Sequence, residues 1–512
     1  MKLALVQINT TVGDLEGNVR RILDAARSAL SDGPDLIVFP EMTISGYPPR
    51  DILYDLSFVD AVQAAMEDLV YRSKNLPPML VGSFAPSGEN MLEHPALNNV
   101  VYLIKNGVKS VAQIKQLLPV YDVFFEPRWF VPGKETLPPI EIAGRKLGIL
   151  ICEDMWDEQY SVHPGADLKR MGADFLICIS AAAYERGGLE NRVYHARRQG
   201  LPIAFVELVG GNDELIFDGG SFVLSKDGEL LHQSGLFKED ISIVNISEAK
   251  SDSIVQSLSS EKEVFDALVL GVHDFFYKNG QKLIVVGLSG GIDSSVAAAI
   301  AVKAVGADHV MGVAIPSRFT DPRSTESARE LAAGLGIGFE VVELEKMHLA
   351  AEQVLGPQRS AGIGGENIQA RLRMIVLMSY VNQFGGLLLN TSNKTELTLG
   401  YSTLYGDMAG AISPLGDLTK PEVYALAEWI NLENAVIPKF IVERKPSAEL
   451  RSDQVDPFDY ETLSPEMEKL VLSSQSNAAM RASEHKRWQM GIVLKVSPKS
   501  FGRGRMMPIT RK

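Results

Sequence analysis

Residues 283–295, Leu-Ile-Val-Val-Gly-Leu-Ser-Gly-Gly-Ile-Asp-Ser-Ser, decide the fold of the second half of the chain. The apolar, β-branched run 283–288 predicts a buried strand. The run ends at Ser289-Gly290-Gly291, and the segment from Ser294 onward combines helix-capping residues with strong helix formers. A strand, a glycine-rich turn and a helix in this order aim backbone N–H groups and the positive end of the helix at an anion. The stretch therefore predicts a phosphate-binding turn.

The side chains of this turn suit a nucleotide with a bound metal ion. Ser289, Ser294 and Ser295 offer hydroxyl donors, whereas Asp293 would repel a phosphate and makes sense as a ligand of Mg²⁺. The turn lacks the lysine of a P-loop and the spacing of a dinucleotide-binding motif. The string SGGIDSS instead resembles the pyrophosphate-binding loop of ATP pyrophosphatases, which cut ATP between its α and β phosphates. An ordinary glycine-rich turn is the alternative, which the full string disfavours.

Length and composition limit the class of protein. A chain of 512 residues with 46% hydrophobic residues predicts two or three domains, each with its own core. No apolar run is long enough to span a bilayer, and the N-terminal apolar patch is too short for a signal peptide. The two cysteines argue against a disulfide framework and favour a reducing, cytoplasmic location. The net charge of −14 argues against nucleic-acid and anionic-membrane partners.

Hydrophobic patterns predict two α/β domains. In residues 1–246 they predict strands at 2–8, 36–41, 79–84, 146–152, 175–180, 202–209 and 241–246, helices at 18–30 and 189–199, and hairpins at Asn106-Gly107 and Asp227-Gly228. The serine-rich segment 247–260 is the expected linker. In residues 261–512 a helix at 263–277 precedes strands at 283–288, 309–315, 339–344 and 386–390, which alternate with helices from 294, at 324–335 and at 366–384. This alternation predicts a doubly wound parallel sheet.

Three residues at strand or loop ends of the first domain suit amide hydrolysis: Glu41, Lys115 and Cys152. A carboxylate can take the proton of a thiol, the thiolate can attack an amide, and a lysine can hold the oxyanion that forms. Each residue alone has a simpler interpretation, as a core thiol or as a surface charge. The pattern alone does not establish that the three meet in space.

The strings around these residues resemble the nitrilase superfamily. FPEMTISGYPPRD (39–51), IKQLLPVYDVFFEPRWF (114–130) and GILICEDMW (148–156) are similar to its three motif blocks, most of all in its glutamine amidohydrolases. The resemblance implies an αββα sandwich with Glu41 as general base, Lys115 as oxyanion-stabilising cation and Cys152 as nucleophile. It also implies that Tyr121, Ser180 and Glu126 bind glutamine or support its site. The segment 180–188 departs from relatives, and Glu207 stands where an asparagine is frequent.

The second half resembles the NAD synthetase family. TSNKTE (391–396), PSRFT (316–320), ENIQARLRM (366–374), KPSAELR (445–451) and FGRGR (501–505) carry this resemblance together with SGGIDSS. The match to glutamine-dependent NAD synthetases spans essentially the whole chain, and the second fold it implies is similar to that of adenine nucleotide alpha hydrolases.

Site residues of the second domain follow from this resemblance. The implied ATP-binding residues are Ser289, Gly290, Gly291, Ile292, Asp293, Ser294, Ser295, Thr391, Lys420 and Ser447. The implied deamido-NAD-binding residues are Asn367, Arg371, Glu396, His485 and Lys486, and Asp293 and Glu396 are the implied Mg²⁺ ligands. The resemblance implies ATP-dependent amidation of deamido-NAD⁺ through an acyl-adenylate, with ammonia from glutamine, in a homo-oligomer.

Three other functions remain open at this point. Another amide-transferring ATP pyrophosphatase, such as a GMP or asparagine synthetase, would carry a different glutaminase domain, so the nitrilase motifs disfavour it. A ligase with a non-catalytic first domain would use ammonia and would not need Cys152. A non-enzymatic adenine-nucleotide sensor would not need the full set of Glu41, Lys115, Cys152, Asp293 and Glu396.

Overall fold

The computed structural model describes residues 1–91, 94–247, 258–452 and 454–499. It forms two compact units, Met1–Asn212 with Ile216–Ser257, and Asp213–Leu215 with Leu258–Lys512. Residues 248–257 of the expected linker 247–260 lie outside the described residues, and its last residue, Ser260, begins the next helix. The string 501–505 lies outside the described residues entirely. Among the described helices, none combines the length and apolar character that a membrane span requires.

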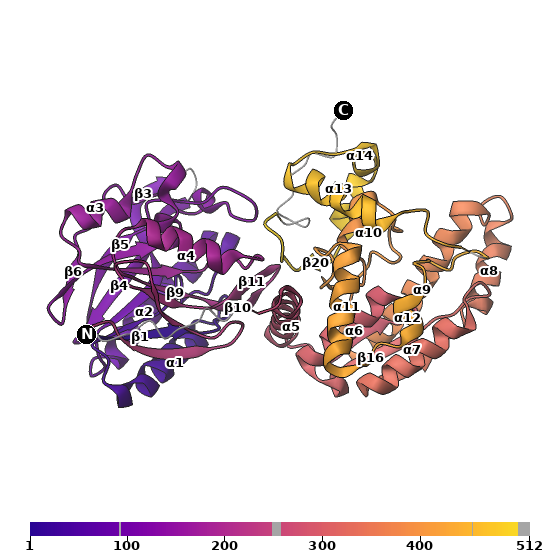
Figure 1. Ribbon diagram of the computed structural model, residues 1–512, viewed down its shortest axis with the longest axis horizontal. Helices are drawn as coiled ribbons and strands as arrows, with labels where there is room; N and C mark the ends of the chain where they lie inside the picture. Colours follow the sequence, from indigo (N-terminus) through magenta and orange to yellow (C-terminus); the bar gives the residue numbers. More distant parts are fainter. Residues whose placement is uncertain (92–93, 248–257, 453, 500–512) are drawn as a thin grey trace. The chain divides into compact units, whose positions relative to one another are not determined.

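The first unit contains two six-stranded sheets (Figure 1). One has the order β14 (Asp240–Asn245), β1 (Lys2–Gln7), β2 (Leu36–Val38), β3 (Met79–Met91), β4 (His94–Lys105) and β5 (Val108–Ile114). The other has the order β13 (Leu230–Gln233), β12 (Phe222–Leu224), β9 (Ile203–Glu207), β8 (Phe175–Ser180), β7 (Arg145–Ile151) and β6 (Ile140–Ile142). In the second sheet β7, β8 and β9 run parallel, so their carboxyl ends share one edge.

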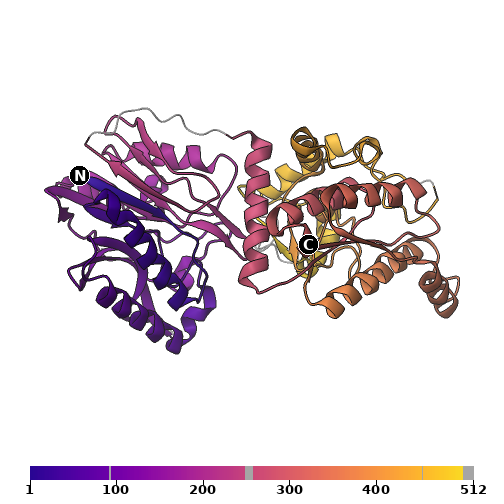
Figure 2. The same cartoon turned by 90° about the horizontal axis from the view of Figure 1, so that it is seen from below.

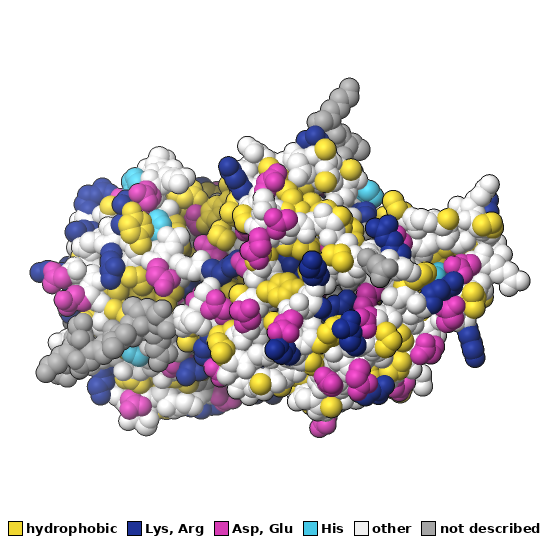
Figure 3. Space-filling view, turned by 45° about the vertical axis from the view of Figure 1, so that its right-hand side comes forward, with side chains coloured by type: hydrophobic (Ala, Val, Ile, Leu, Met, Phe, Trp, Pro, Cys, Tyr) yellow, Lys and Arg dark blue, Asp and Glu magenta, His cyan; other side chains and the backbone are white. Residues whose placement is uncertain are grey.

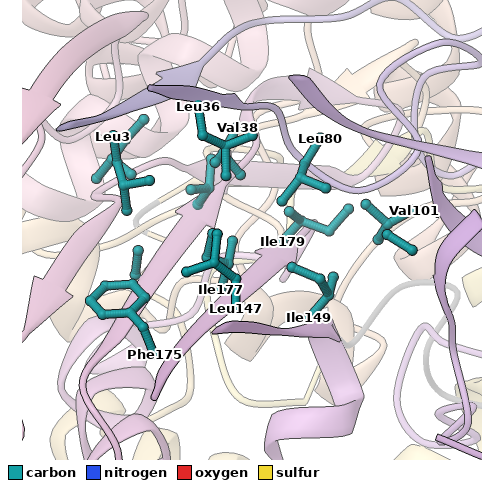
Figure 4. Close-up of a cluster of buried hydrophobic side chains, with 14 of the residues drawn as sticks. Leu3, Leu36, Val38, Leu80, Val101, Leu147, Ile149, Phe175, Ile177 and Ile179 are labelled. Atoms are coloured by element: carbon teal, nitrogen blue, oxygen red, sulfur yellow. The ribbon is translucent and has the colours of Figure 1, made fainter. Parts of the chain in front are cut away.

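The core of this unit lies between the two sheets (Figure 4). Ile149 of β7 and Ile177 of β8 join Leu3, Val38 and other residues of the first sheet in one buried cluster. The alternate residues Leu150, Leu176 and Cys178 pack on the other side, in a cluster with side chains of the covering helices. Because side chains alternate along a strand, a stretch buried on both faces carries no polar side chain, as in residues 147–151 of β7 and 175–179 of β8.

Helices cover the outer faces and complete an αββα arrangement. α1 (Leu15–Ser28) and α2 (Leu56–Arg72) pack side by side (Figure 2). α3 (Pro164–Arg170) packs against β7, and α4 (Gly188–Arg198) contributes to the cluster outside the second sheet. The fold class expected for the first domain is therefore confirmed.

The second unit is built on a four-stranded parallel sheet with the order β17 (Gly338–Val341), β16 (Val310–Ala314), β15 (Ile284–Gly287) and β18 (Leu387–Leu388). The chain moves from β15 to β16 and β17 on one side and returns to β18 on the other. The strand order therefore reverses between β15 and β18, which is the point where doubly wound sheets bind ligands.

Helices pack around this sheet and beyond it. α6 (Ile292–Val305) contacts β15 and β16, and α7 (Pro322–Leu335) contacts β16 and β17. α9 (Gly362–Phe384) places Val376 and Leu377 in one cluster with Val285 and Leu388. The other helices are α5 (Ser260–Lys278), α8 (Glu345–Leu355), α10 (Lys394–Leu399), α11 (Lys420–Asn434), α12 (Lys439–Glu443), α13 (Tyr460–Leu472) and α14 (Ala478–Ser483). The expected doubly wound sheet is confirmed.

Several expected elements differ in extent. The helix expected at 18–30 begins at Leu15, because the Asp14 side chain caps it by accepting from Gly17 N–H. The strand expected at 386–390 has only two residues, and Leu389 instead bridges to Ile412. The strand expected at 339–344 ends at Val341.

On one face of the molecule, acidic and basic side chains are interspersed (Figure 3).

Candidate active sites

The first site forms where strand ends of the two sheets of the first unit meet. Glu41 lies in the turn after β2, Lys115 follows β5, and Cys152 follows β7. Lys115 Nζ donates to Glu41 Oε1 at 2.8 Å, and Cys152 interacts electrostatically with both residues. Glu41 and Lys115 are fully buried, and Cys152 is 7% exposed. The structure thus brings together three residues that the sequence spreads between positions 41 and 152.

A network of hydrogen bonds holds the Glu41 carboxylate in place. Oε1 accepts from Asn99 Nδ2 at 2.6 Å, and Oε2 accepts from the backbone N–H of Ala181 at 3.1 Å. Burial alone would lower the pKa of Lys115, but Glu126 and Glu41 raise it well above its usual value. Lys115 is therefore a permanent cation at the centre of the site.

Glu126, which was expected to bind glutamine or support its site, lies in contact with Lys115. Its Oε1 accepts from Lys115 Nζ and from the Tyr47 hydroxyl, each at 2.9 Å. Burial raises the pKa of Glu126, and Lys115 opposes the shift. Two carboxylates thus share one ammonium group, which fixes the position of that group.

Cys152 has the features of a strained, buried nucleophile. Its backbone lies in the left-handed region with φ 44°, which costs a non-glycine residue roughly 1–3 kcal/mol. Burial raises the pKa of its thiol well above the usual value, Glu41 adds to the shift, and Lys115 opposes it. The thiol therefore keeps its proton at rest and needs a base, for which Glu41 is the neighbouring group.

Two of the expected glutamine-binding residues lie at the edge of this site. The Tyr121 hydroxyl donates to Glu153 Oε2 at 2.8 Å, and the Tyr160 hydroxyl donates to Glu153 Oε1 at 2.8 Å. Ser180 is fully buried at the end of β8 and lies against Cys152. Glu153, a 4% exposed carboxylate next to Cys152, was not predicted from the sequence.

Glu207 is a second carboxylate that was not assigned a role from the sequence. It is fully buried at the end of β9, and its Oε1 accepts from the backbone N–H groups of Ala182 at 2.8 Å and Leu208 at 3.1 Å. Its Oε2 lies 3.6 Å from Arg192, which is paired with Asp218. Burial raises the pKa of Glu207 to about 8, against the effect of Arg192. The site therefore contains a titratable carboxyl group near the thiol.

The second site forms where β15 and β18 end. Lys420 Nζ lies 2.5 Å from Asp293 Oδ2 and 3.3 Å from Glu396 Oε1. Asn393 Nδ2 donates to the other oxygen of Asp293 at 2.9 Å. Burial alone would lower the pKa of Lys420, but Asp293 and Glu396 raise it far above its usual value. Two carboxylates from different elements thus converge on one cation.

The glycine-rich turn borders a pocket at this point. Gly290 has φ 73°, and a Cβ atom there would lie 2.3 Å from the carbonyl oxygen of Ser324, so only glycine fits. The hydroxyls of Ser294 and Ser295 donate to the carbonyl oxygen of Gly291. Of the residues expected to bind ATP, the pocket lining includes Ser289, Gly291, Ile292, Asp293, Ser294, Thr391, Lys420 and Ser447, and it also includes Glu396.

The other residues expected to contact deamido-NAD converge on the segment 400–404. Lys486 Nζ donates to the carbonyl oxygens of Gly400 and Ser402 at 2.8 and 2.6 Å, and Arg371 Nε donates to that of Leu404 at 3.1 Å. The Thr403 hydroxyl donates to Asn367 Oδ1 at 2.8 Å. His485 is exposed beside Lys486. None of these four residues lines the pocket, but the segment that Asn367, Arg371 and Lys486 contact reaches the pocket lining through Tyr401.

Comparison with known proteins finds a family match for each half of the chain. The carbon–nitrogen hydrolase family matches residues 2–254, and the NAD synthase family matches residues 264–494. The chain is thus a two-domain protein that joins an amide-cleaving fold to a nucleotide-dependent synthase fold. It belongs to the family of glutamine-dependent NAD⁺ synthetases.

Individual relatives match over nearly their full length. The glutamine-dependent NAD⁺ synthetase of Synechocystis sp. is 37% identical over 99% of this chain and 98% of its own. That of Thermotoga maritima is 34% identical over 100% and 99%. A solved structure of the Acinetobacter baumannii enzyme with ADP is 32% identical, covers 99% of this chain and 98% of its own, and has a TM-score of 0.79. A structure from Cytophaga hutchinsonii, 20% identical with a TM-score of 0.77 over 99% and 97% of the chains, agrees in fold.

Proposed function

We propose that this protein makes NAD⁺ by ATP-dependent amidation of deamido-NAD⁺, with ammonia released from glutamine. The observation that carries the proposal is the presence of two complementary sites on one chain. One is the buried Glu41, Lys115 and Cys152 group, and the other is the pocket where Lys420 lies between Asp293 and Glu396. The full-length relatives support the same reaction.

At the first site the reaction is an amide hydrolysis. Glu41 takes the proton of Cys152, and the thiolate attacks the side-chain carbonyl carbon of glutamine while Lys115 stabilises the oxyanion. Glu41 returns the proton to the leaving nitrogen, and ammonia departs to leave a glutamyl thioester. Water, deprotonated by Glu41, then hydrolyses the thioester to glutamate and the free thiol. Tyr121 and Ser180 hold the substrate in this proposal.

At the second site the carboxylate of deamido-NAD⁺ becomes an acyl donor. A carboxylate oxygen attacks the α-phosphorus of ATP, and pyrophosphate leaves to give an acyl-adenylate. Ammonia then attacks the acyl carbon, and AMP leaves to give the carboxamide. Ser289, Gly291 and the start of α6 line the pocket, where the positive end of the helix would stabilise the charge that passes to pyrophosphate. Asn367, Arg371, Glu396, His485 and Lys486 contact deamido-NAD⁺ in this proposal.

The donor set at the second site fits Mg²⁺. Asp293 and Glu396 already direct oxygens at the ammonium group of Lys420, and two carboxylates completed by substrate phosphates are a usual Mg²⁺ environment. Bound there, the ion supplies positive charge next to the phosphates. Lys420 remains a second cation for the same phosphates.

The proposal has three further parts. The domains are residues 1–246 and 261–512, joined by 247–260, and the family matches over 2–254 and 264–494 support this division. The enzyme is cytoplasmic, which its two unpaired cysteines support. It is a homo-oligomer, as its resemblance to the family implies, and sedimentation equilibrium of the purified protein tests this part.

A stoichiometric assay tests the reaction. The purified protein is supplied with deamido-NAD⁺, ATP, Mg²⁺ and glutamine, and NAD⁺, AMP, pyrophosphate and glutamate are measured together. The proposal predicts that NAD⁺, AMP and pyrophosphate form in equal amounts, and that AMP formation requires deamido-NAD⁺. Formation of ADP, or equal activity with xanthosine monophosphate or aspartate in place of deamido-NAD⁺, would refute it.

A further inference from the structure

Arg444 links the phosphate-binding turn to the segment that follows α12. Its Nη1 donates to the Ser324 hydroxyl at 2.6 Å and lies 3.5 Å from the carbonyl oxygen of Gly290. Its Nη2 donates to Glu449 Oε1 at 2.9 Å, and the Ser324 hydroxyl donates to the same oxygen at 2.8 Å. Arg444 and Glu449 both line the pocket of the second site. A guanidinium and a carboxylate are thus paired beside the turn.

The pairing places a negative charge where a polyphosphate is expected. Glu449 has a side chain only 15% exposed, and its charge also acts on the buried guanidinium of Arg373, another residue of the pocket lining. Glu449 is therefore the ion-pair partner of Arg444 and, with Asp407, one of two carboxylates whose charge acts on Arg373. A polyphosphate in the pocket would be repelled by the Glu449 carboxylate and attracted by both cations.

Hydrogen bonds that do not involve the Glu449 carboxylate hold the backbone around this residue. The Glu449 N–H donates to the Ser447 hydroxyl at 3.2 Å, and the Leu450 N–H donates to Gln454 Oε1 at 2.7 Å. Gln369 Nε2 holds the carbonyl oxygen of Leu450 at 2.8 Å. Rotation of the carboxylate away from Arg444 would expose donors that suit phosphate oxygens, because a guanidinium binds phosphate through a pair of N–H groups.

We propose that Arg444 binds the β- and γ-phosphates of the nucleotide, and that Glu449 is its counter-ion in the free enzyme, which the phosphates replace. The inference rests on the proposed function, because it takes the pocket to be the ATP site. Arg444 is then a substrate-contacting residue. Glu449 lowers the affinity for the polyphosphate, because it competes with the phosphates for Arg444.

Calorimetric titrations with ATP and AMP, in the presence of Mg²⁺ and without deamido-NAD⁺, test this exchange in the full-length protein. Arg444→Gln should weaken ATP binding about tenfold or more, as expected for lost charged hydrogen bonds, and should leave AMP binding nearly unchanged. Glu449→Gln, which keeps an acceptor oxygen but loses the charge, should strengthen ATP binding several-fold. In the double variant the gain from Glu449→Gln should disappear. Arg451→Gln is the matched control, since Arg451 is on the same segment, is mostly exposed and is absent from the pocket lining.

The outcomes separate this inference from the proposed function. Equal weakening of ATP and AMP by Arg444→Gln would show a structural role and overturn the inference alone, and so would weaker ATP binding by Glu449→Gln. Failure of the wild-type protein to bind ATP at all would overturn the proposed function and the inference with it. In turnover, the inference requires a raised KM for ATP in Arg444→Gln with an unchanged KM for deamido-NAD⁺.

Discussion

Replacing Glu207 by glutamine should stabilise the first unit, by an amount that grows with pH. Burial raises the pKa of the Glu207 carboxyl group to about 8 in the folded protein. An unfolded glutamate titrates at about 4.3. Between these values the folded state holds a proton that the unfolded state has released. The wild-type protein therefore loses stability as the pH rises through this interval, and the Glu207→Gln variant does not.

The size of the effect follows from the shift. A difference of one in pKa corresponds to about 1.4 kcal/mol of unfolding free energy. With a folded pKa of about 8 and an unfolded pKa of about 4.3, Glu207→Gln should gain roughly 5 kcal/mol over wild type at and above pH 8, and almost nothing at pH 4. Glutamine has the same shape as the protonated acid, and its Oε1 can keep the bonds from Ala182 and Leu208. The substitution also removes a charge that raises the pKa of Cys152.

Hydrogen exchange of β8 reports the stability of the first unit separately from that of the second unit. The exchange is measured by mass spectrometry at increasing denaturant between pH 5 and pH 9. The protection difference between Glu207→Gln and wild type should widen steadily up to pH 8. Glu229→Gln, at an exposed position of the same unit, is the control and should show no such trend. A difference that is independent of pH, or a variant less stable than wild type at pH 8, would refute the reasoning.

Three other substitutions separate the two sites. Lys115→Met should lower glutamate release by a factor of about a hundred or more, since it removes the oxyanion-stabilising cation. It should leave NAD⁺ synthesis from ammonium intact, and loss of both rates would contradict this expectation. Gly290→Ala should reduce NAD⁺ synthesis at least tenfold with either nitrogen donor, because the added Cβ would lie 2.3 Å from the Ser324 carbonyl oxygen. A fully active variant would show that catalysis does not need the backbone conformation that only glycine allows here. Lys420→Gln should raise the KM for ATP about tenfold through the loss of a charged contact, and an unchanged KM would remove Lys420 from the ATP site.

Much of the fold could be predicted from strand patterns. β8 is buried on both faces and is therefore apolar from Phe175 to Ile179, with only the terminal Ser180 polar, and it was predicted with the observed ends. α2 was missed although Val59, Val62, Met66 and Leu69 lie at helical spacing and are buried, so the signal was present. The strand at 386–390 was predicted too long, because the last bond to β15 comes from the Leu389 N–H, and the Asn390 N–H donates instead to the carbonyl oxygen of Ile412.

Part of the first candidate site could likewise be predicted from the sequence, and part could not. Glu41, Lys115 and Cys152 could be singled out as strand-end residues, but their meeting depends on how the two sheets stack, which no local pattern contains. Glu207 is a lone acid in the apolar run 202–209, which is a detectable signal. Its role could not be predicted, because its environment depends on Arg192, which is distant in sequence.

The central claim is that the first site supplies nitrogen and the second site uses it. NAD⁺ formation by wild type and Cys152→Ala, with saturating glutamine or with ammonium, tests this claim most directly. We predict that the variant loses the glutamine-driven rate and keeps the ammonium-driven rate. A variant that still uses glutamine, or that loses both rates while remaining folded, would contradict the account.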